Sequence, residues 1–169
     1  MSNYKEDLQK VKAFAFDVDG VFSNANVYLH PNGEMMRTMN IKDGFAVKFA
    51  VDHGFPIAII TGGNSEAVRK RFNDIGVGDV YIKSPNKRDD FEDFIIKYEL
   101  TYEDVLYMGD DLPDYEIMKR VLIAACPADA VEEIKSISRY ISHCNGGYGC
   151  VRDVIEQVMR AQDSWFKIH

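Results

Sequence analysis

The chain has 169 residues, of which 46% are hydrophobic and 28% charged, the profile of one ordinary globular domain spanning residues 1–169. A net charge of -7 argues against nucleic acid as a partner, because nucleic-acid binding needs a basic surface. No apolar run is long enough to cross a bilayer, and residues 1–10 lack a signal-peptide core. We therefore expect a cytoplasmic protein with no membrane contact. Three cysteines without a tight pattern predict no disulfide framework.

The first half of the chain predicts two buried strands with a hairpin and a helix between them. The first apolar run stops at Asp17, and Pro31-Asn32-Gly33 is typical of a hairpin turn. The helix that follows ends near Gly54. The expected elements are a strand over 11–16, hairpin strands over 26–30 and 35–39, a helix over 45–51, and a strand over 56–60.

The second half repeats the alternation of helix and strand. Asn64 or Ser65 can cap a helix that stops at Gly76, and Pro113 suits the first position of another helix. The expected elements are a helix to about 75, a strand over 80–82, a helix over 88–98, a strand over 105–108, a helix from 113, a strand over 121–124, and a closing helix over 150–162.

Strands that alternate with helices imply right-handed crossovers and a parallel sheet covered on both faces. We therefore predict a doubly wound α/β fold, with a small hairpin insertion at about 24–40 and no cap domain. In such sheets, ligands bind at the carboxyl ends of the strands.

Polar residues follow the predicted strands at that edge. They are Asp17-Val18-Asp19-Gly20, Thr61-Gly62-Gly63 and Gly109-Asp110-Asp111, and Lys87 opens the helix before the last of these strands. Two carboxylates at about 4 Å and an effective dielectric near 20 repel by on the order of 4 kcal/mol, so a cation is needed. Mg²⁺ suits a few carboxylates with water and phosphate oxygens, and Lys87 adds charge for a phosphoryl group.

Each feature alone has a plain structural explanation. Most Asp-x-Asp pairs are turns or caps, and a lysine at a helix start is usually solvated. All of them in this order, each at the end of a predicted strand or the start of a helix, are hard to explain as turns.

The same residues resemble the motifs of the haloacid dehalogenase superfamily of phosphatases. The four matches are Phe16-Asp17-Val18-Asp19-Gly20-Val21, Ile60-Thr61-Gly62, Lys87, and Gly109-Asp110-Asp111-Leu112-Pro113-Asp114. The likeness runs from about Val11 to Glu156. It is greatest to a small capless branch that includes phosphatases of 3-deoxy-D-manno-octulosonate 8-phosphate. That branch is indicated by Asp19-Gly20-Val21, Asn32-Gly33-Glu34, Lys42-Asp43-Gly44 and Gly146-Gly147-Tyr148-Gly149-Cys150-Val151-Arg152.

The resemblance implies roles for the catalytic residues. Asp17 is similar to the nucleophile that forms an aspartyl-phosphate, and Asp19 to the general acid that later acts as base. Thr61 and Lys87 resemble the groups that stabilise the phosphoryl oxygens. The implied magnesium ligands are Asp17, the Asp19 carbonyl, Asp110 and, through water, Asp111, with Asp114 structural.

The substrate that the resemblance implies is a small anionic sugar-acid phosphate. Its first candidate is 3-deoxy-D-manno-octulosonate 8-phosphate, and a nine-carbon sialic-type acid 9-phosphate is second. The expected contacts are Gly62, Gly63, Lys42 and Arg69, although residues 69–71 also suit a solvated helix face. Relatives often carry Gly-Gln where this chain has Lys83-Ser84, and a large charged residue at position 63, so the sugar acid stays open.

Two other classes of protein share part of this pattern. A phospho-receiver domain also uses carboxylates, a hydroxyl and a lysine, but its phosphorylated aspartate ends a middle strand, and here those strands end in Thr61 and Ile82-Lys83. A non-catalytic oligomerisation domain is disfavoured by the intact set of acidic residues, Thr61 and Lys87. The segments between the motifs are too short for a lid domain, and capless relatives are typically tetramers. We therefore expect a homo-oligomer, a tetramer by resemblance, whose subunits cover one another's sites.

Overall fold

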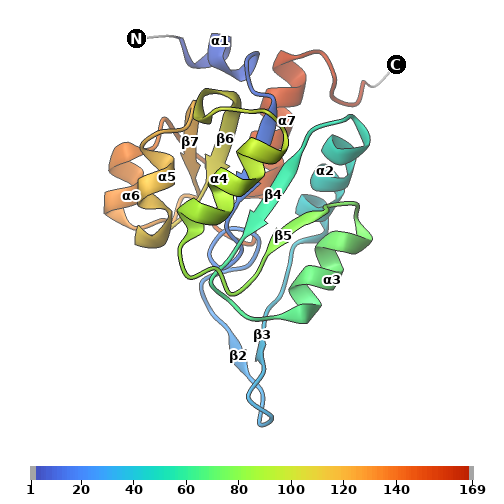
Figure 1. Cartoon of the computed structure of the whole chain (residues 1–169), viewed down its shortest axis with the longest axis vertical. Coiled ribbons are helices and arrows are strands. Elements are labelled where there is room, and N and C mark those ends of the chain that lie inside the picture. Colours follow the sequence, from blue (N-terminus) through green and yellow to red (C-terminus); the bar gives the residue numbers. More distant parts are fainter. Residues whose placement is uncertain (1–2, 168–169) are drawn as a thin grey trace.

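The computed structural model describes residues 3–167. It has a central parallel sheet with helices on both faces (Figure 1). Its strands are β1 (Ala13–Phe16), β4 (Ile57–Ile60), β5 (Asp79–Tyr81), β6 (Val105–Met108), β7 (Ile123–Cys126) and β8 (Tyr140–Ile141). The helices are α1 (Tyr4–Leu8), α2 (Ile41–Asp52), α3 (Glu66–Asp74), α4 (Lys87–Lys97), α5 (Tyr115–Met118), α6 (Glu132–Ile137) and α7 (Cys150–Ala161), with short 3₁₀ turns at Tyr102–Asp104 and Leu112–Asp114.

The strand order β5-β4-β1-β6-β7-β8 confirms the doubly wound α/β fold. From β1 the chain first builds outward through β4 and β5, and then crosses to the other side to build β6, β7 and β8. The winding therefore changes direction beside β1, where such sheets bind their ligands. Phe16 pairs with Ile59 on β4 and with Met108 on β6, so the residues that follow these three strands emerge side by side.

Alternate residues of each strand enter two separate cores. Phe14 and Phe16 pack with residues of α2, α3 and α7 on one face, whereas Ala13 and Ala15 pack with residues of α4, α5 and α6 on the other. All four strand residues are fully buried. Because both faces are covered, the strands are continuously apolar, and only the residues beyond their carboxyl ends are free to be polar.

The hairpin β2 (Tyr28–Leu29) and β3 (Met35–Met36) projects from the carboxyl edge of the sheet (Figure 1). Its two strands are antiparallel, and Gly33 in the turn has a φ of +89°, a conformation that glycine adopts at little cost. The predicted hairpin is therefore confirmed, with shorter strands than expected.

Most other predicted elements are present with shifted ends. Ser65 caps α3 and Asn86 caps α4, each through its side chain. The strand expected over 121–124 is β7, two residues later, and the patterns missed α1, α6 and β8, which are all short. No helix within residues 3–167 has the length and apolarity required to cross a membrane.

Candidate active site

A cleft of about 1710 Å³ opens at the carboxyl edge of the sheet, at the foot of the hairpin. Its walls come from the loops after β1, β4 and β6, the start of α4, and the hairpin. Its charged lining residues are Asp17, Asp19, Glu34, Arg37, Glu66, Arg71, Lys87, Asp110 and Asp111. The cleft lies where the winding of the sheet changes direction, so it is the candidate active site.

Asp17 lies at the floor of this cleft, directly after β1, and is 6% exposed. Its backbone N–H donates to the Met108 carbonyl at 3.0 Å, which extends the pairing of β1 with β6 by one residue. Its Oδ1 accepts from the Val18 N–H at 2.7 Å and lies 2.8 Å from Nζ of Lys87. Burial raises the pKa of Asp17, and the charge of Asp114 raises it further, while Lys87 opposes both effects. A positive charge is therefore needed to keep this carboxylate ionised.

Lys87 bridges two carboxylates. Its Nζ lies 2.8 Å from Asp17 and 2.8 Å from Asp114, and its side chain is 7% exposed. Asp114 also accepts from the Tyr107 hydroxyl at 2.7 Å and from the backbone N–H groups of Asp110 and Asp111. Both oxygens of the fully buried Asp114 are thus engaged within the protein, an arrangement that suits a structural carboxylate.

Asp110 has the clearest unsatisfied group in the cleft. Its Oδ1 is buried and has no hydrogen-bond partner, and burial raises its pKa to about 7. Oxygens of Asp17, Asp110 and Asp114 lie within 4.8 Å of one another. The Asp114 oxygens already accept four hydrogen bonds. The oxygens that remain available to bind a metal ion therefore belong to Asp17 and Asp110. Two hard oxygens, one of them orphaned, suit a divalent cation such as Mg²⁺.

Asp19 is held by an arginine. Nε of Arg37 lies 2.5 Å from Oδ1 of Asp19, and Nη2 lies 3.0 Å from Oδ2, a bidentate ion pair. Ser23 adds a hydroxyl 3.4 Å from Oδ1. The side chain of Asp19 is 37% exposed, so it can meet a ligand in the cleft, whereas the Arg37 side chain is 5% exposed.

Thr61, Gly62 and Gly63 line the cleft after β4, as predicted. Oγ1 of Thr61 accepts from the Gly63 N–H at 3.1 Å, and the Lys83 N–H donates to the Gly63 carbonyl at 2.9 Å. Lys83 has a φ of +55°, in the left-handed region that glycine favours. A glycine would adopt this backbone conformation at lower cost than the lysine.

Three of the residues expected at the site lie away from Asp17, Lys87 and Asp110. Asp111 lines the cleft, but it is exposed and its Oδ1 caps the following turn through the Leu112 N–H. Lys42 is exposed at the start of α2 and is not among the cleft residues. Arg69 is also absent from the lining and donates to the Val80 carbonyl at 3.0 Å. Arg71, two residues later on α3, lines the cleft instead.

Arg37 was not among the residues expected at the site, and Arg71 lines the cleft in place of the expected Arg69. A usable signal for Arg37 was the hairpin itself, because a hairpin returns the chain to its own starting point and brings position 37 back to the Asp19 loop. Residues 69 and 71 differ by about 200° around a helix, so the docked face of α3 decides between them.

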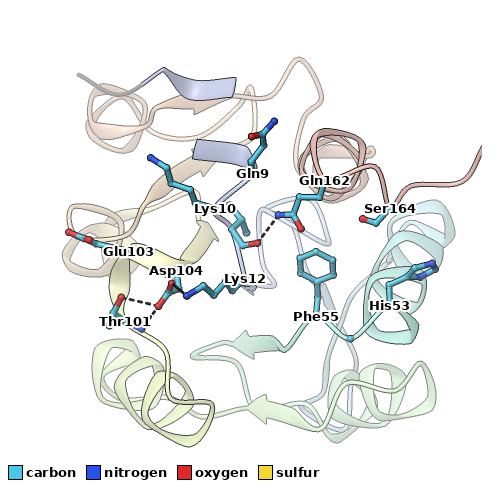
Figure 2. A pocket seen from close by; sticks show the side chains of 12 residues that line it. Gln9, Lys10, Lys12, His53, Phe55, Thr101, Glu103, Asp104, Gln162 and Ser164 are labelled. Atoms are coloured by element: carbon cyan, nitrogen blue, oxygen red, sulfur yellow. Dashed lines mark hydrogen bonds and ion pairs between the residues drawn. The ribbon is translucent and has the colours of Figure 1, made fainter. Parts of the chain in front are cut away.

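A second hollow of about 680 Å³ lies at the opposite, amino-terminal edge of the sheet (Figure 2). An ion pair crosses it: Lys12 lies 2.7 Å from Asp104, and Asp104 also accepts from Thr101. Gln162 donates to the Val11 carbonyl. These contacts link the segments that precede β1 and β6 to the end of α7.

Comparison with known proteins agrees with this geometry. The family model of haloacid dehalogenase-like hydrolases matches residues 72–155. The chain is 33% identical over 154 residues to the 3-deoxy-D-manno-octulosonate 8-phosphate phosphatase KdsC of Salmonella typhi, which covers 91% of this chain and 82% of that protein. The chain therefore belongs to the KdsC-type phosphatases of the haloacid dehalogenase-like hydrolases, and it is a phosphoric monoester hydrolase.

Solved structures agree in detail. The 3-deoxy-D-manno-octulosonate 8-phosphate phosphatase of Yersinia pestis matches with a TM-score of 0.92 at 28% identity, over 95% of this chain and 86% of that one. The corresponding phosphatase of Moraxella catarrhalis matches with a TM-score of 0.90 at 27% identity, over 94% and 91%. That structure was solved in complex with magnesium, phosphate and the sugar acid KDO.

Proposed function

We propose that this enzyme hydrolyses a sugar-acid phosphate monoester in a magnesium-dependent reaction, with 3-deoxy-D-manno-octulosonate 8-phosphate as the leading substrate. The observation that carries the proposal is the pairing of buried Asp17 with Lys87 beside the orphaned oxygen of Asp110. The substrates of the relatives at 33% identity support the choice of sugar acid.

Asp17 is the proposed nucleophile. An oxygen of its carboxylate attacks phosphorus, the bond from phosphorus to the sugar oxygen breaks, and an aspartyl-phosphate forms. Asp19 gives its proton to the leaving sugar oxygen and then takes a proton from the water that attacks the same phosphorus. This second step releases inorganic phosphate and restores the Asp17 carboxylate. Lys87 and the Thr61 hydroxyl stabilise the charge that builds on the phosphoryl oxygens.

The residues present fit a magnesium ion. Asp17 and Asp110 would hold it through their side chains, with the Asp19 carbonyl as the third protein ligand that the family resemblance implies. Bound magnesium neutralises the carboxylates and the incoming phosphoryl group. Asp111, on the outer wall, would act through water.

A phosphate-release screen tests the proposal. The panel contains 3-deoxy-D-manno-octulosonate 8-phosphate, a nine-carbon sialic-type acid 9-phosphate and neutral sugar phosphates, each with magnesium and with excess chelator. We expect the highest kcat/KM with the eight-carbon acid, no turnover in chelator, and recovery on adding magnesium. A neutral sugar phosphate as the best substrate would overturn the sugar-acid assignment, and full activity in chelator would overturn the metal.

We also propose that the chain works as a homo-oligomer, with a tetramer as the expected state. The hairpin presents four apolar side chains to solvent: Tyr28, Leu29, Met35 and Met36, between 46% and 78% exposed. An isolated two-stranded hairpin is marginally stable, and packing against a second copy would bury these side chains. The foot of the hairpin also lines the cleft, so a neighbour docked on it would lie near the substrate.

Sedimentation at assay concentration measures this directly. We expect an oligomer for the wild-type chain, and lower assembly together with lower turnover after replacing residues 26–38 by a short loop. A fully active monomer would contradict the proposal.

A further inference from the structure

Arg37 follows β3 of the hairpin and lines the cleft with a side chain that is only 5% exposed. Its guanidinium makes the bidentate pair with Asp19, and its Nη1 donates to the Met35 carbonyl at 2.6 Å. The pair joins the hairpin to the loop after β1, across 18 positions of sequence. The guanidinium is therefore held on one side by a carbonyl of β3 and on the other by Asp19.

Gly63 makes room for this arginine. A Cβ on Gly63 would lie 2.7 Å from Nη2 of Arg37, closer than real contacts allow, and 3.4 Å from Oγ1 of Thr61. The space that a side chain at position 63 would occupy is thus filled by the guanidinium. The cation beside Gly63 therefore comes from the hairpin.

Asp19 depends on this contact for its orientation. Its other side-chain bond is the 3.4 Å contact with Ser23, and more than a third of its side chain is exposed. A planar guanidinium that binds both carboxylate oxygens fixes the plane of the carboxyl group as well as its position. When one oxygen carries the proton for the leaving group, the other can keep its bond to Arg37.

We propose that Arg37 is a positioning residue for the phosphatase reaction, which holds the Asp19 carboxyl group toward the leaving oxygen in the space that Gly63 leaves open. This inference rests on the proposed role of Asp19 as general acid. Arg37 connects the hairpin to Asp19, so a change in the position of the hairpin would alter proton transfer by Asp19.

The test compares two kinds of leaving group. An alkyl phosphate, such as the sugar-acid phosphate, needs a proton on its leaving oxygen, whereas 4-nitrophenyl phosphate releases a stable phenolate without one. We expect Arg37→Ala to lower kcat on the alkyl phosphate about tenfold or more, a share of the factor of about 10²–10⁴ that general acid–base catalysis supplies. On the aryl phosphate the loss should stay within about threefold, and Arg37→Lys should restore part of the alkyl activity.

The variant Gly63→Leu tests the Arg37 contact independently. The added side chain should displace the guanidinium and reproduce the selective loss on the alkyl phosphate. The double variant with Arg37→Ala should lose little more than either single variant, because both remove the same contact. Gly78→Leu is the matched control, since a Cβ at Gly78 meets nothing within 4 Å. Additive losses would contradict the shared contact.

Asp19→Asn separates this inference from the proposed function. If Asp19→Asn loses alkyl activity selectively and Arg37→Ala loses both activities equally or neither, Arg37 has no positioning role and the reaction scheme stands. If Asp19→Asn itself shows no selectivity for the leaving group, the acid role fails, and the inference about Arg37 fails with it.

Discussion

Gly20 lies against the carboxylate of Asp110 so closely that a Cβ on Gly20 would overlap with Oδ2 of Asp110. This contact joins the loop after β1, which carries Asp17 and Asp19, to the loop after β6. The backbone at Gly20 has a φ of +84°, which a side chain rarely adopts. The missing side chain therefore lets the loop with the proposed nucleophile and the loop with the proposed metal ligand meet.

Gly20→Ala should lower turnover about a hundredfold and raise the magnesium concentration needed for half-maximal activity, because Asp110 must move away from Asp17. Gly54→Ala is the matched control: its φ is +87°, and a Cβ there meets nothing within 4 Å. Both variants should lose about 1–2 kcal/mol of stability from the left-handed backbone. Magnesium titrations of activity check the difference, and similar activity in the two variants would contradict the role of the contact.

Asp17→Asn should retain the fold, because the side chain is nearly isosteric, and should abolish phosphate release, because an amide is not a competent nucleophile. Acid-quenched wild-type enzyme should contain hydroxylamine-sensitive phosphate on Asp17, and the variant none. Unfolding curves control for stability. Residual activity within about tenfold of wild type, a difference of about 1.4 kcal/mol, would refute the nucleophile assignment.

Asp114→Asn should destabilise the protein by about 3 kcal/mol, because it leaves Lys87 with one buried partner and turns an amide N–H₂ toward existing donors. Tyr107→Phe removes only one neutral donor from Asp114 and should cost about 1 kcal/mol. Denaturant unfolding gives both values. If Asp114→Asn weakened magnesium binding without loss of stability, Asp114 would be a metal ligand and not a structural carboxylate.

Asp43 predicts a pH dependence of stability. It is fully buried on α2, its Oδ1 accepts from the Arg152 N–H at 2.8 Å, and its Oδ2 has no partner. Burial raises its pKa to about 6 from a usual value of 3.8. Between these values the native state binds more protons than the unfolded state, so stability falls as pH rises, by on the order of 3 kcal/mol.

Asp43→Asn removes this titration. The free energy of unfolding of the variant, relative to wild type, should therefore increase as pH rises from about 4 to 6 and then level off. Asp89→Asn, at an exposed carboxylate on α4, is the control. A constant difference between Asp43→Asn and wild type over this range would show that Asp43 does not titrate there.

The hydrophobic pattern by itself determined the strands of the sheet and the edge of the sheet at which the site lies. Apolar strands that end at Asp17, Thr61 and Gly109 leave no alternative edge for polar residues, because the carboxyl ends of parallel strands lie at one edge. Lys87 was expected where a helix opens, and Asn86 caps that helix through its side chain. The resemblance to known motifs then added the chemistry of these positions.

Only the tertiary structure decided which side chains meet. Asp110, Asp111 and Asp114 are close in sequence, but the 3₁₀ turn at Leu112–Asp114 directs Asp114 to Lys87 and leaves Asp111 outside. The docking of α3 selects Arg71 over Arg69, and the hairpin brings Arg37 to Asp19. Side-chain direction in loops and on docked helices depends on backbone angles and packing between distant segments, and local sequence patterns do not specify these.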